Sequence, residues 1–147
     1  MNIQLEAIGL IHSPFSDPAT TPIQSARSEA SGWIEIFPEY AAGLQDIEGF
    51  SHLYVLYLLH QTSEIQLTVE PFLDTQKHGV FATRHPFRPN HLGLSIVTLI
   101  SRQENRLNIT GVDMFDQTPL LDIKPYVPEF DQRDNVRTGW YEHRAKS

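Results

Sequence analysis

The sequence predicts a mostly β-sheet domain of the barrel or sandwich class. Short apolar runs recur along the 147 residues, with turn residues between them, which is typical of small all-β folds. No Gly-x-Gly-x-x-Gly follows a predicted strand and opens a helix, so a doubly wound nucleotide-binding fold is not expected. The length suits one domain with a hydrophobic core.

The first third of the chain predicts two strands and one helix. Residues 5–11 alternate in part and end before Ser13-Pro14, where proline would interrupt a ladder. Residues 16–31 form a long polar loop of a kind that is usually functional or disordered. Residues 32–37 alternate as a strand does, and residues 38–47 carry apolar side chains at helical spacing.

The rest of the sheet follows from four further runs. Residues 51–60 are almost uniformly apolar, which predicts a central strand buried on both faces. Residues 65–69 predict a shorter strand. Residues 93–101 and 106–111 predict a hairpin, and residues 120–124 predict the last strand.

A stiff loop is expected over residues 79–94, between strands. Its two prolines, Pro86 and Pro89, remove backbone donors and disfavour helix. It also carries Arg84 and Arg88. A rigid loop that presents polar side chains is a common binding element, and a surface turn whose arginines pair with acids is the alternative.

Composition restricts the classes of function. Eleven basic and eighteen acidic residues give a net charge of −7, which argues against general binding to a phosphate backbone. There is no cysteine, and the seven histidines lack ligand-like spacing, so no metal site is expected. No signal peptide is evident, and no apolar run reaches the roughly 18 residues of a membrane span, which predicts a cytoplasmic protein.

Four separated segments together resemble one family. They resemble the TsaA-like (TrmO) family in sequence and in their order along the chain, over roughly residues 5–130. The segments are residues 8–15 (Ile-Gly-Leu-Ile-His-Ser-Pro-Phe), 49–53, 79–94 and 113–126. The resemblance implies a small β-barrel with few short helices over residues 1–130, and a tail over residues 131–147 with at most a short helix. It also implies a homodimer. The activity implied is transfer of methyl from S-adenosylmethionine to N6 of the threonylcarbamoylated adenosine beside the tRNA anticodon.

The cofactor sets chemical demands that can be matched to these segments. Its carboxylate requires an arginine such as Arg84, and its adenine requires polar backbone groups and an apolar floor. Phe81, Ala82 and Leu94 can supply that floor, and the turn at 116–119 can supply acceptors. The family's ligand contacts correspond to Pro22, Ile23, Gln24, His60, Gln61, Arg84, Leu94, Asp116, Gln117, Thr118 and Pro119. His60 is equally well explained as a satisfied core histidine.

The chain departs from the family pattern in four places. Ile23 stands where many relatives have arginine, and His85 stands where serine is usual. His91-Leu92 replaces Pro-Ile, and Gln117 replaces glycine. A side chain at position 117 disfavours a positive φ there. The missing basic group at 23 weakens the expectation of RNA more than that of the cofactor.

Asp122, Lys124 and Tyr126 are the predicted catalytic residues. Their spacing places them on one face of a strand. In the functional interpretation they face the acceptor adenine, as a proton acceptor, a cation and a stacking ring. In the alternative they lie on a solvent-facing surface, where Asp122 and Lys124 form a weak ion pair.

The sequence therefore predicts a tRNA methyltransferase that uses S-adenosylmethionine. Two other functions stay open. The first is a protein that binds S-adenosylmethionine and acts on a small molecule, which the net charge of −7 favours. The second is a non-enzymatic binding module of the same fold.

Overall fold

The computed structural model describes residues 1–16 and 29–144. The chain forms two compact units, each described here by itself. The barrel unit comprises Met1–Leu58 and Gly93–Tyr126, and the loop unit comprises Leu59–Leu92 and Val127–Ser147. The loop unit includes residues on both sides of position 130. The division of the chain into a barrel domain over residues 1–130 and a tail over residues 131–147 stays a prediction.

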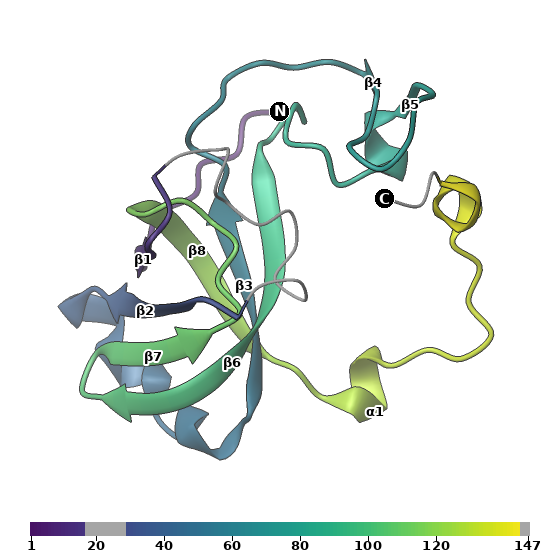
Figure 1. Cartoon of the computed structure of the whole chain (residues 1–147). Helices are drawn as coiled ribbons and strands as arrows, with labels where there is room; N and C mark the ends of the chain where they lie inside the picture. The colour runs from purple at the N-terminus through teal and green to yellow at the C-terminus, as the bar shows by residue number, and fades with distance from the viewer. Residues whose placement is uncertain (17–28, 145–147) are drawn as a thin grey trace. The chain divides into compact units, whose positions relative to one another are not determined.

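The barrel unit is built on a closed barrel of six strands, which confirms the mostly β prediction and selects the barrel over the sandwich (Figure 1). β1 lies between β2 and β8, and both pairs are antiparallel. The closed order around the barrel is β1 (Gly9–His12), β2 (Ser31–Ile36), β7 (Arg106–Thr110), β6 (Leu92–Gln103), β3 (His52–Leu58) and β8 (Thr118–Pro125).

Aliphatic side chains fill the barrel interior, because alternate residues of each strand point inward. On β3, Leu53, Val55 and Tyr57 are buried, and the residues between them are half-buried. The prediction of a strand buried on both faces is therefore wrong. The outer face of a barrel strand is uncovered unless another element packs on it. The residues with the smallest exposure in this unit are Ile11, Ile34, Leu53, Val55, Leu107, Val112 and Leu120.

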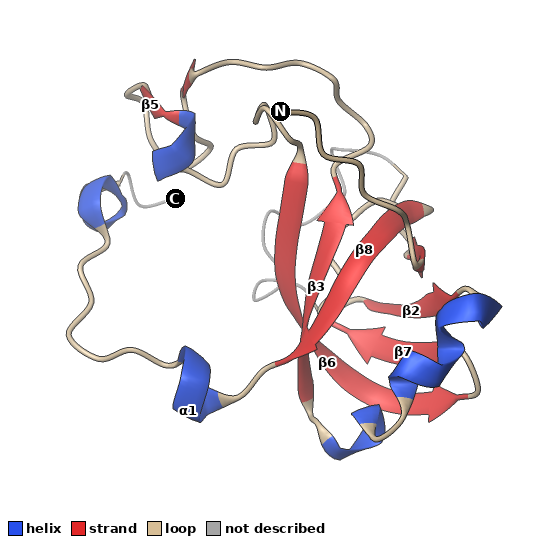
Figure 2. Ribbon diagram, turned by 180° about the vertical axis from the view of Figure 1, so that it is seen from behind, coloured by secondary structure: helices blue, strands red, loops and turns tan. Residues whose placement is uncertain are grey.

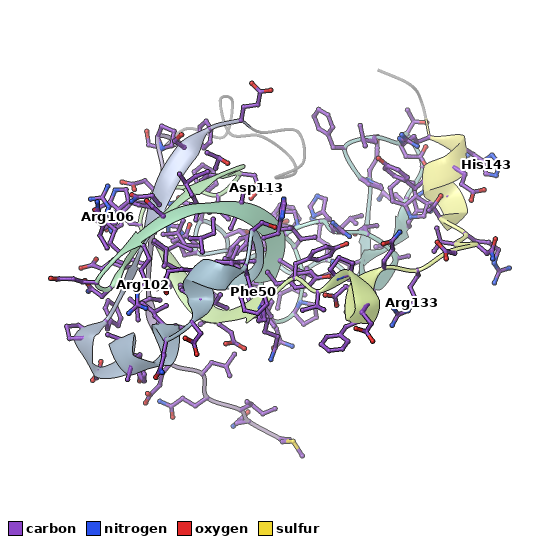
Figure 3. All side chains as sticks on the ribbon, turned by 90° about the horizontal axis from the view of Figure 1, so that it is seen from below. Phe50, Arg102, Arg106, Asp113, Arg133 and His143 are labelled. Carbon is purple, nitrogen blue, oxygen red and sulfur yellow. The ribbon has the colours of Figure 1, made fainter. Side chains whose placement is uncertain are left out.

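The helix expected over residues 38–47 is two 3-10 turns, η2 (Pro38–Leu44) and η3 (Ile47–Gly49). Asp46 separates them with a left-handed φ of 71°. Arg102 of β6 donates from Nη1 to the Leu44 carbonyl at 3.0 Å and to Glu48 Oε1 at 2.9 Å. These bonds attach the two 3-10 segments to the barrel. Figure 3 labels Arg102 and Phe50, the residue that follows η3.

Other strand boundaries differ from the predictions. β1 begins at Gly9, and Leu5 is exposed, so the expected start at residue 5 is wrong. The hairpin between β6 and β7 is confirmed, with Glu104 at a φ of 56° in its turn. Short helices are few and mostly single turns, as Figure 2 shows in blue.

The loop unit contains little regular structure. β4 (Thr68–Val69) pairs with β5 (His78–Gly79), so the strand expected over residues 65–69 is mostly irregular. A 3-10 turn, η4 (Val80–Ala82), follows β5, and the last segment holds α1 (Pro128–Asp131) and η5 (Gly139–His143). Among the residues described, no helix is both long and apolar enough to cross a bilayer.

Candidate active site

The predicted site residues fall into three groups. Leu94, residues 116–119, Asp122 and Lys124 of β8, and Tyr126 directly after β8 belong to the barrel unit. His60, Gln61 and Arg84 belong to the loop unit. Residues 22–24 lie outside the described part of the chain. The geometry below therefore concerns each unit separately.

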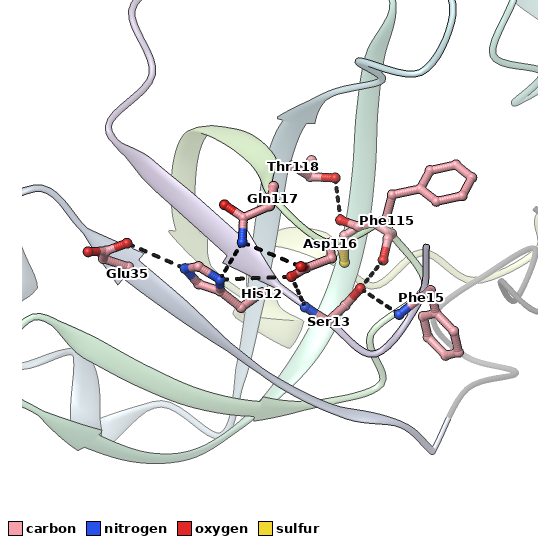
Figure 4. A network of polar contacts seen from close by, with 9 residues as sticks. His12, Ser13, Phe15, Glu35, Phe115, Asp116, Gln117 and Thr118 are labelled. Carbon is pink, nitrogen blue, oxygen red and sulfur yellow. Dashed lines mark hydrogen bonds and ion pairs between the residues drawn. The ribbon is translucent and has the colours of Figure 1, made fainter. Parts of the chain in front are cut away.

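The turn before β8 is attached to the end of β1 (Figure 4). The Asp116 amide donates to the Phe15 carbonyl at 2.7 Å, and the Ser13 amide donates to Asp116 Oδ1 at 3.0 Å. At the first residue of β8, the buried Thr118 hydroxyl donates to the Phe115 carbonyl at 2.6 Å, so only Asp116 and Gln117 of the turn predicted at 116–119 precede the strand. These bonds hold the Asp116 carboxylate in place while leaving it partly exposed, as a ligand-binding group must be.

Gln117 lies at the outer corner of this turn with a φ of 66°. A side chain at position 117 was expected to disfavour a positive φ. Gln117 nevertheless adopts one, because the tertiary structure imposes that conformation in spite of the local cost. The Gln117 carboxamide nitrogen lies 3.1 Å from His12 Nδ1. His12 stacks on Trp33 with a centroid distance of 3.8 Å, and its Nε2 lies 3.4 Å from Glu35 Oε2.

His12, Trp33 and Glu35 were absent from the predicted site. Strand pairing brings His12 to this place, since His12 of β1 lies opposite Trp33 of β2. The remaining member of the group, Arg106 of β7, places its guanidinium 4.1 Å from the Trp33 ring centroid. No local pattern marks this cluster, because its members come from three strands and a turn.

The two arginines of the loop at 79–94 differ in environment. The Arg88 side chain is half-buried, and its Nη1 lies within hydrogen-bonding distance of the Val80, Thr83 and His85 carbonyls, at 2.9, 2.7 and 3.4 Å. It therefore ties the loop to itself. Arg84 is exposed. The loop thus has one arginine that shapes it and one whose side chain reaches the surface.

His85 is part of the same internal bonding. Its Nδ1 accepts a hydrogen bond from the Phe87 amide at 3.2 Å, which requires a neutral imidazole. Burial lowers the pKa of His85, opposed by the nearby Glu64 carboxylate and reinforced by Arg88.

A β-bulge determines which face of β8 carries the predicted catalytic residues. Tyr57 lies opposite Leu120, whereas Leu56 lies opposite Asp122, so Leu121 is an extra residue. A bulge of this kind reverses the alternation of side chains. Leu120 therefore points inward, and Asp122 and the residues two and four positions later point outward.

The outward trio is partly paired within itself. Lys124 Nζ lies 3.8 Å from Asp122 Oδ2, with both side chains more than half exposed. The Tyr126 ring lies 5.7 Å from that of Tyr54 on the neighbouring strand. The shared face is as expected, and the weak ion pair of the alternative interpretation is present too. The catalytic role stays a prediction.

Asp122 also lines an open groove of the barrel unit with a volume of about 440 Å³. The groove lies among the 3-10 turns and the ends of β1 and β8, and most of its lining is apolar. Tyr40 and Phe50 supply aromatic rings, so a flat ring with a polar edge fits the chemistry of this surface. The other residues that line it are Ile8, Ile36, Gly43, Leu44, Gln45, Asp46, Ile47, Ile123 and Pro125.

The remaining predicted contacts are at the surface. Leu94 is 49% exposed on the outer face of β6, as the predicted apolar floor requires. Gln61 Nε2 lies 3.1 Å from His60 Nε2, and the His60 side chain is only half-buried, so a fully enclosed core histidine is excluded. Within residues 1–16 and 29–144, no cluster of His, Asp and Glu is arranged to hold a metal ion.

These features define a class of small closed β-barrels that carry a polar turn and an outward strand face with Asp122 and Lys124 beside an apolar groove. The chain belongs to the TrmO family, because the model of the tRNA-methyltransferase O N-terminal domain matches residues 10–132.

Relatives agree with this assignment. The chain is 56% identical to a probable S-adenosyl-L-methionine-binding protein of Pyrococcus abyssi, over 92% of this chain and 74% of that protein. It is 34% identical to the human tRNA (adenine(37)-N6)-methyltransferase, over 92% of this chain but only 32% of the human protein. A crystal structure of TrmO superposes with a TM-score of 0.81 at 38% identity, covering 95% of this chain and 64% of that one.

Proposed function

We propose that this protein is an S-adenosylmethionine-dependent methyltransferase that methylates N6 of threonylcarbamoyladenosine next to the anticodon of tRNA. The observation that carries the proposal is the match to the family model over residues 10–132. The chain spans about a third of the human methyltransferase, so activity on tRNA is a property that this chain must be tested for directly.

The residues present fit the proposed cofactor chemically. Arg84 is an exposed guanidinium that suits the ligand's carboxylate. In the barrel unit, the fixed Asp116 carboxylate suits the ribose hydroxyls or an amine, and Leu94 offers an apolar surface. When bound, the cofactor supplies a methyl group on a positively charged sulfur. Nearby carboxylates stabilise that positive charge. The other predicted contacts are His60, Gln61, Gln117, Thr118 and Pro119, together with residues 22–24, which lie outside the described part of the chain.

Catalysis would rest mainly on alignment. The N6 lone pair of adenine is delocalised into the ring, so the amine is a poor nucleophile and must be held in line with the methyl group. Asp122 would accept the proton that N6 loses. Its position at the edge of the apolar groove supports this role, since Tyr40 and Phe50 could pack on a base there.

The distribution of charge shapes the expectation for RNA. The barrel unit has 4 basic and 11 acidic residues, whereas the loop unit has 7 of each. Contacts to phosphate would therefore fall mostly to the loop unit, through few cations. We expect weak RNA affinity and a shallow dependence of binding on salt.

The test measures the cofactor and the acceptor separately. Calorimetry should show binding of S-adenosylmethionine at micromolar levels, roughly −8 kcal/mol. Radiolabelled methyl should appear in tRNA that carries the threonylcarbamoyl group and be absent from the same tRNA without it. No binding at millimolar concentration of S-adenosylmethionine or its demethylated product would end the methyltransferase proposal.

A second candidate is a methyltransferase or binding protein for a small molecule. The net charge of −7 favours it, and the Pyrococcus abyssi relative is named only for binding S-adenosyl-L-methionine. Strong cofactor binding with both tRNAs unlabelled would replace the tRNA proposal with this one.

We further propose that the protein is a homodimer. The outer face of β6 exposes Leu94, Ile96 and Ile100 by 49%, 39% and 60%, which leaves an apolar strip that a second copy could cover. Light scattering coupled to gel filtration should give twice the mass of 16.8 kDa. An Ile96→Glu variant should shift the protein to the monomer, and a monomeric wild type would contradict the proposal.

A further inference from the structure

The turn before β8 holds a residue in a conformation that its side chain does not favour. Gln117 has a φ of 66°, in the left-handed region that glycine enters freely and other residues enter at a cost. The turn is fixed on both sides, by the bonds of Asp116 to β1 and by the buried Thr118. Gln117 therefore cannot relax without disturbing its neighbours.

The Gln117 side chain has a bond that offsets this cost. Its carboxamide nitrogen is a donor, and it lies 3.1 Å from His12 Nδ1, which can accept. The other ring nitrogen of His12, Nε2, lies 3.4 Å from Glu35 Oε2, and Nδ1 also lies 3.8 Å from Asp116 Oδ1. Figure 4 shows His12 joined in this way to Gln117, Asp116 and Glu35.

His12 is itself held in place by rings and charges. Its ring stacks on Trp33 at an interplanar angle of 14°, and Arg106 covers the Trp33 ring. The His12 side chain is 17% exposed. A nearly enclosed ring is a rigid partner, and a rigid partner can select one conformation of a flexible glutamine.

We propose that His12 is a positioning residue that holds Gln117 and, through it, the turn at 116–119 in the conformation that binds the cofactor. This inference rests on the proposed function, because it takes that turn to contact S-adenosylmethionine. His12 acts on the ligand only through the turn. Its importance depends on the residue at 117: a glycine there would not need it.

The dependence on residue 117 makes the proposal testable by a double-mutant cycle. His12→Phe keeps a ring to stack on Trp33 and removes the acceptor. Gln117→Gly removes the side chain and tolerates positive φ. We expect His12→Phe alone to weaken S-adenosylmethionine binding about tenfold. In the Gln117→Gly background, the same change should alter the Kd by less than about twofold.

A second measurement reports the turn without cofactor. Amide hydrogen exchange of residues 115–118 should accelerate in His12→Phe and return toward the wild-type rate in the double variant. A purely structural His12 would instead lower the melting temperature equally in both backgrounds and show no rescue by glycine. Equal effects in both backgrounds, or unchanged exchange in His12→Phe, would overturn the proposal.

The two measurements separate this inference from the proposed function. If the wild type fails to bind S-adenosylmethionine, the proposed function fails, while the exchange data still show whether His12 holds Gln117. If the cofactor binds and the cycle is additive, the proposed function survives and the positioning role of His12 does not.

Discussion

The barrel unit and the loop unit are stabilised in different ways. Among the described residues, 14 of the 16 buried hydrophobic residues belong to the barrel unit, and only Val69 and Val80 belong to the loop unit. The loop unit relies on polar side chains that bond to backbone, such as Arg88 on three carbonyls and Trp140 Nε1 on the Ala82 carbonyl at 2.7 Å.

The units differ in charge as well. The barrel unit has a net charge of −7 and the loop unit is neutral, with five of the seven histidines. A core of aliphatic side chains tolerates changes at its surface, whereas a loop held by single polar contacts depends on each of them. Substitutions at the barrel surface should therefore change turnover or binding with little change in stability. In the loop unit, a substitution of an exposed residue should change binding, and a substitution of a residue that bonds to the backbone should change stability.

The largest effect is expected at Asp122. Asp122→Asn removes the proposed proton acceptor and should reduce turnover by about a hundredfold or more. Its ion pair with Lys124 is exposed, so the free energy of unfolding should change by less than about 1 kcal/mol. The assay is methyl transfer to modified tRNA, with cofactor affinity measured alongside. Glu104→Gln, which changes another exposed carboxylate of the barrel unit, is the matched control, and an active Asp122→Asn enzyme would return Asp122 to a surface role.

The next effect is expected at Arg84, in the loop unit. Arg84→Ala should weaken cofactor binding by roughly 1.5–3 kcal/mol, about ten- to a hundredfold, if the guanidinium contacts the carboxylate. The melting temperature should hardly change, because Arg84 is exposed. Arg84→Lys should recover part of the affinity, since it keeps the charge but loses the planar fork. Unchanged affinity in the alanine variant would make Arg84 an ordinary surface residue.

Arg88, four residues away, should behave in the opposite way. Arg88→Ala removes the guanidinium that three carbonyls of the loop share and should destabilise the loop by roughly 1.5–3 kcal/mol. Hydrogen exchange across residues 80–91 is the measurement, because exchange resolves the loop unit from the barrel. Exchange as slow as in the wild type would show that the loop does not depend on this arginine.

The smallest effect is a dependence of loop stability on pH, through His85. Its folded-state pKa is lowered, chiefly by burial, so the unfolded chain binds the proton more readily. Stability from this residue is complete above the unfolded pKa of about 6.5 and is lost as pH falls from there through the lower folded pKa. Unfolding by urea between pH 7.5 and pH 5 should show a steeper loss for wild type than for His85→Ser. Parallel curves for the two proteins would contradict the assignment.

The sequence by itself determined the fold class, the hairpin of β6 and β7 and the family. Alternation of apolar residues reports which side chains face a core, and turn residues report where strands end, so both can be read locally. The ordered segments at 8–15, 79–94 and 113–126 were specific enough for the family, which the match over residues 10–132 confirms.

Only the tertiary structure decided what depends on residues far apart in the chain. The bulge at Leu121 turns the Asp122 face outward, and the closure of the barrel leaves β3 half-buried on its outer side. Arg84 and Arg88 look alike in sequence, yet one is exposed and the other binds three carbonyls. His12 meets Gln117 across 105 positions. Local patterns carry no record of such contacts, because the free energy that selects them comes from packing of strands that are remote in sequence.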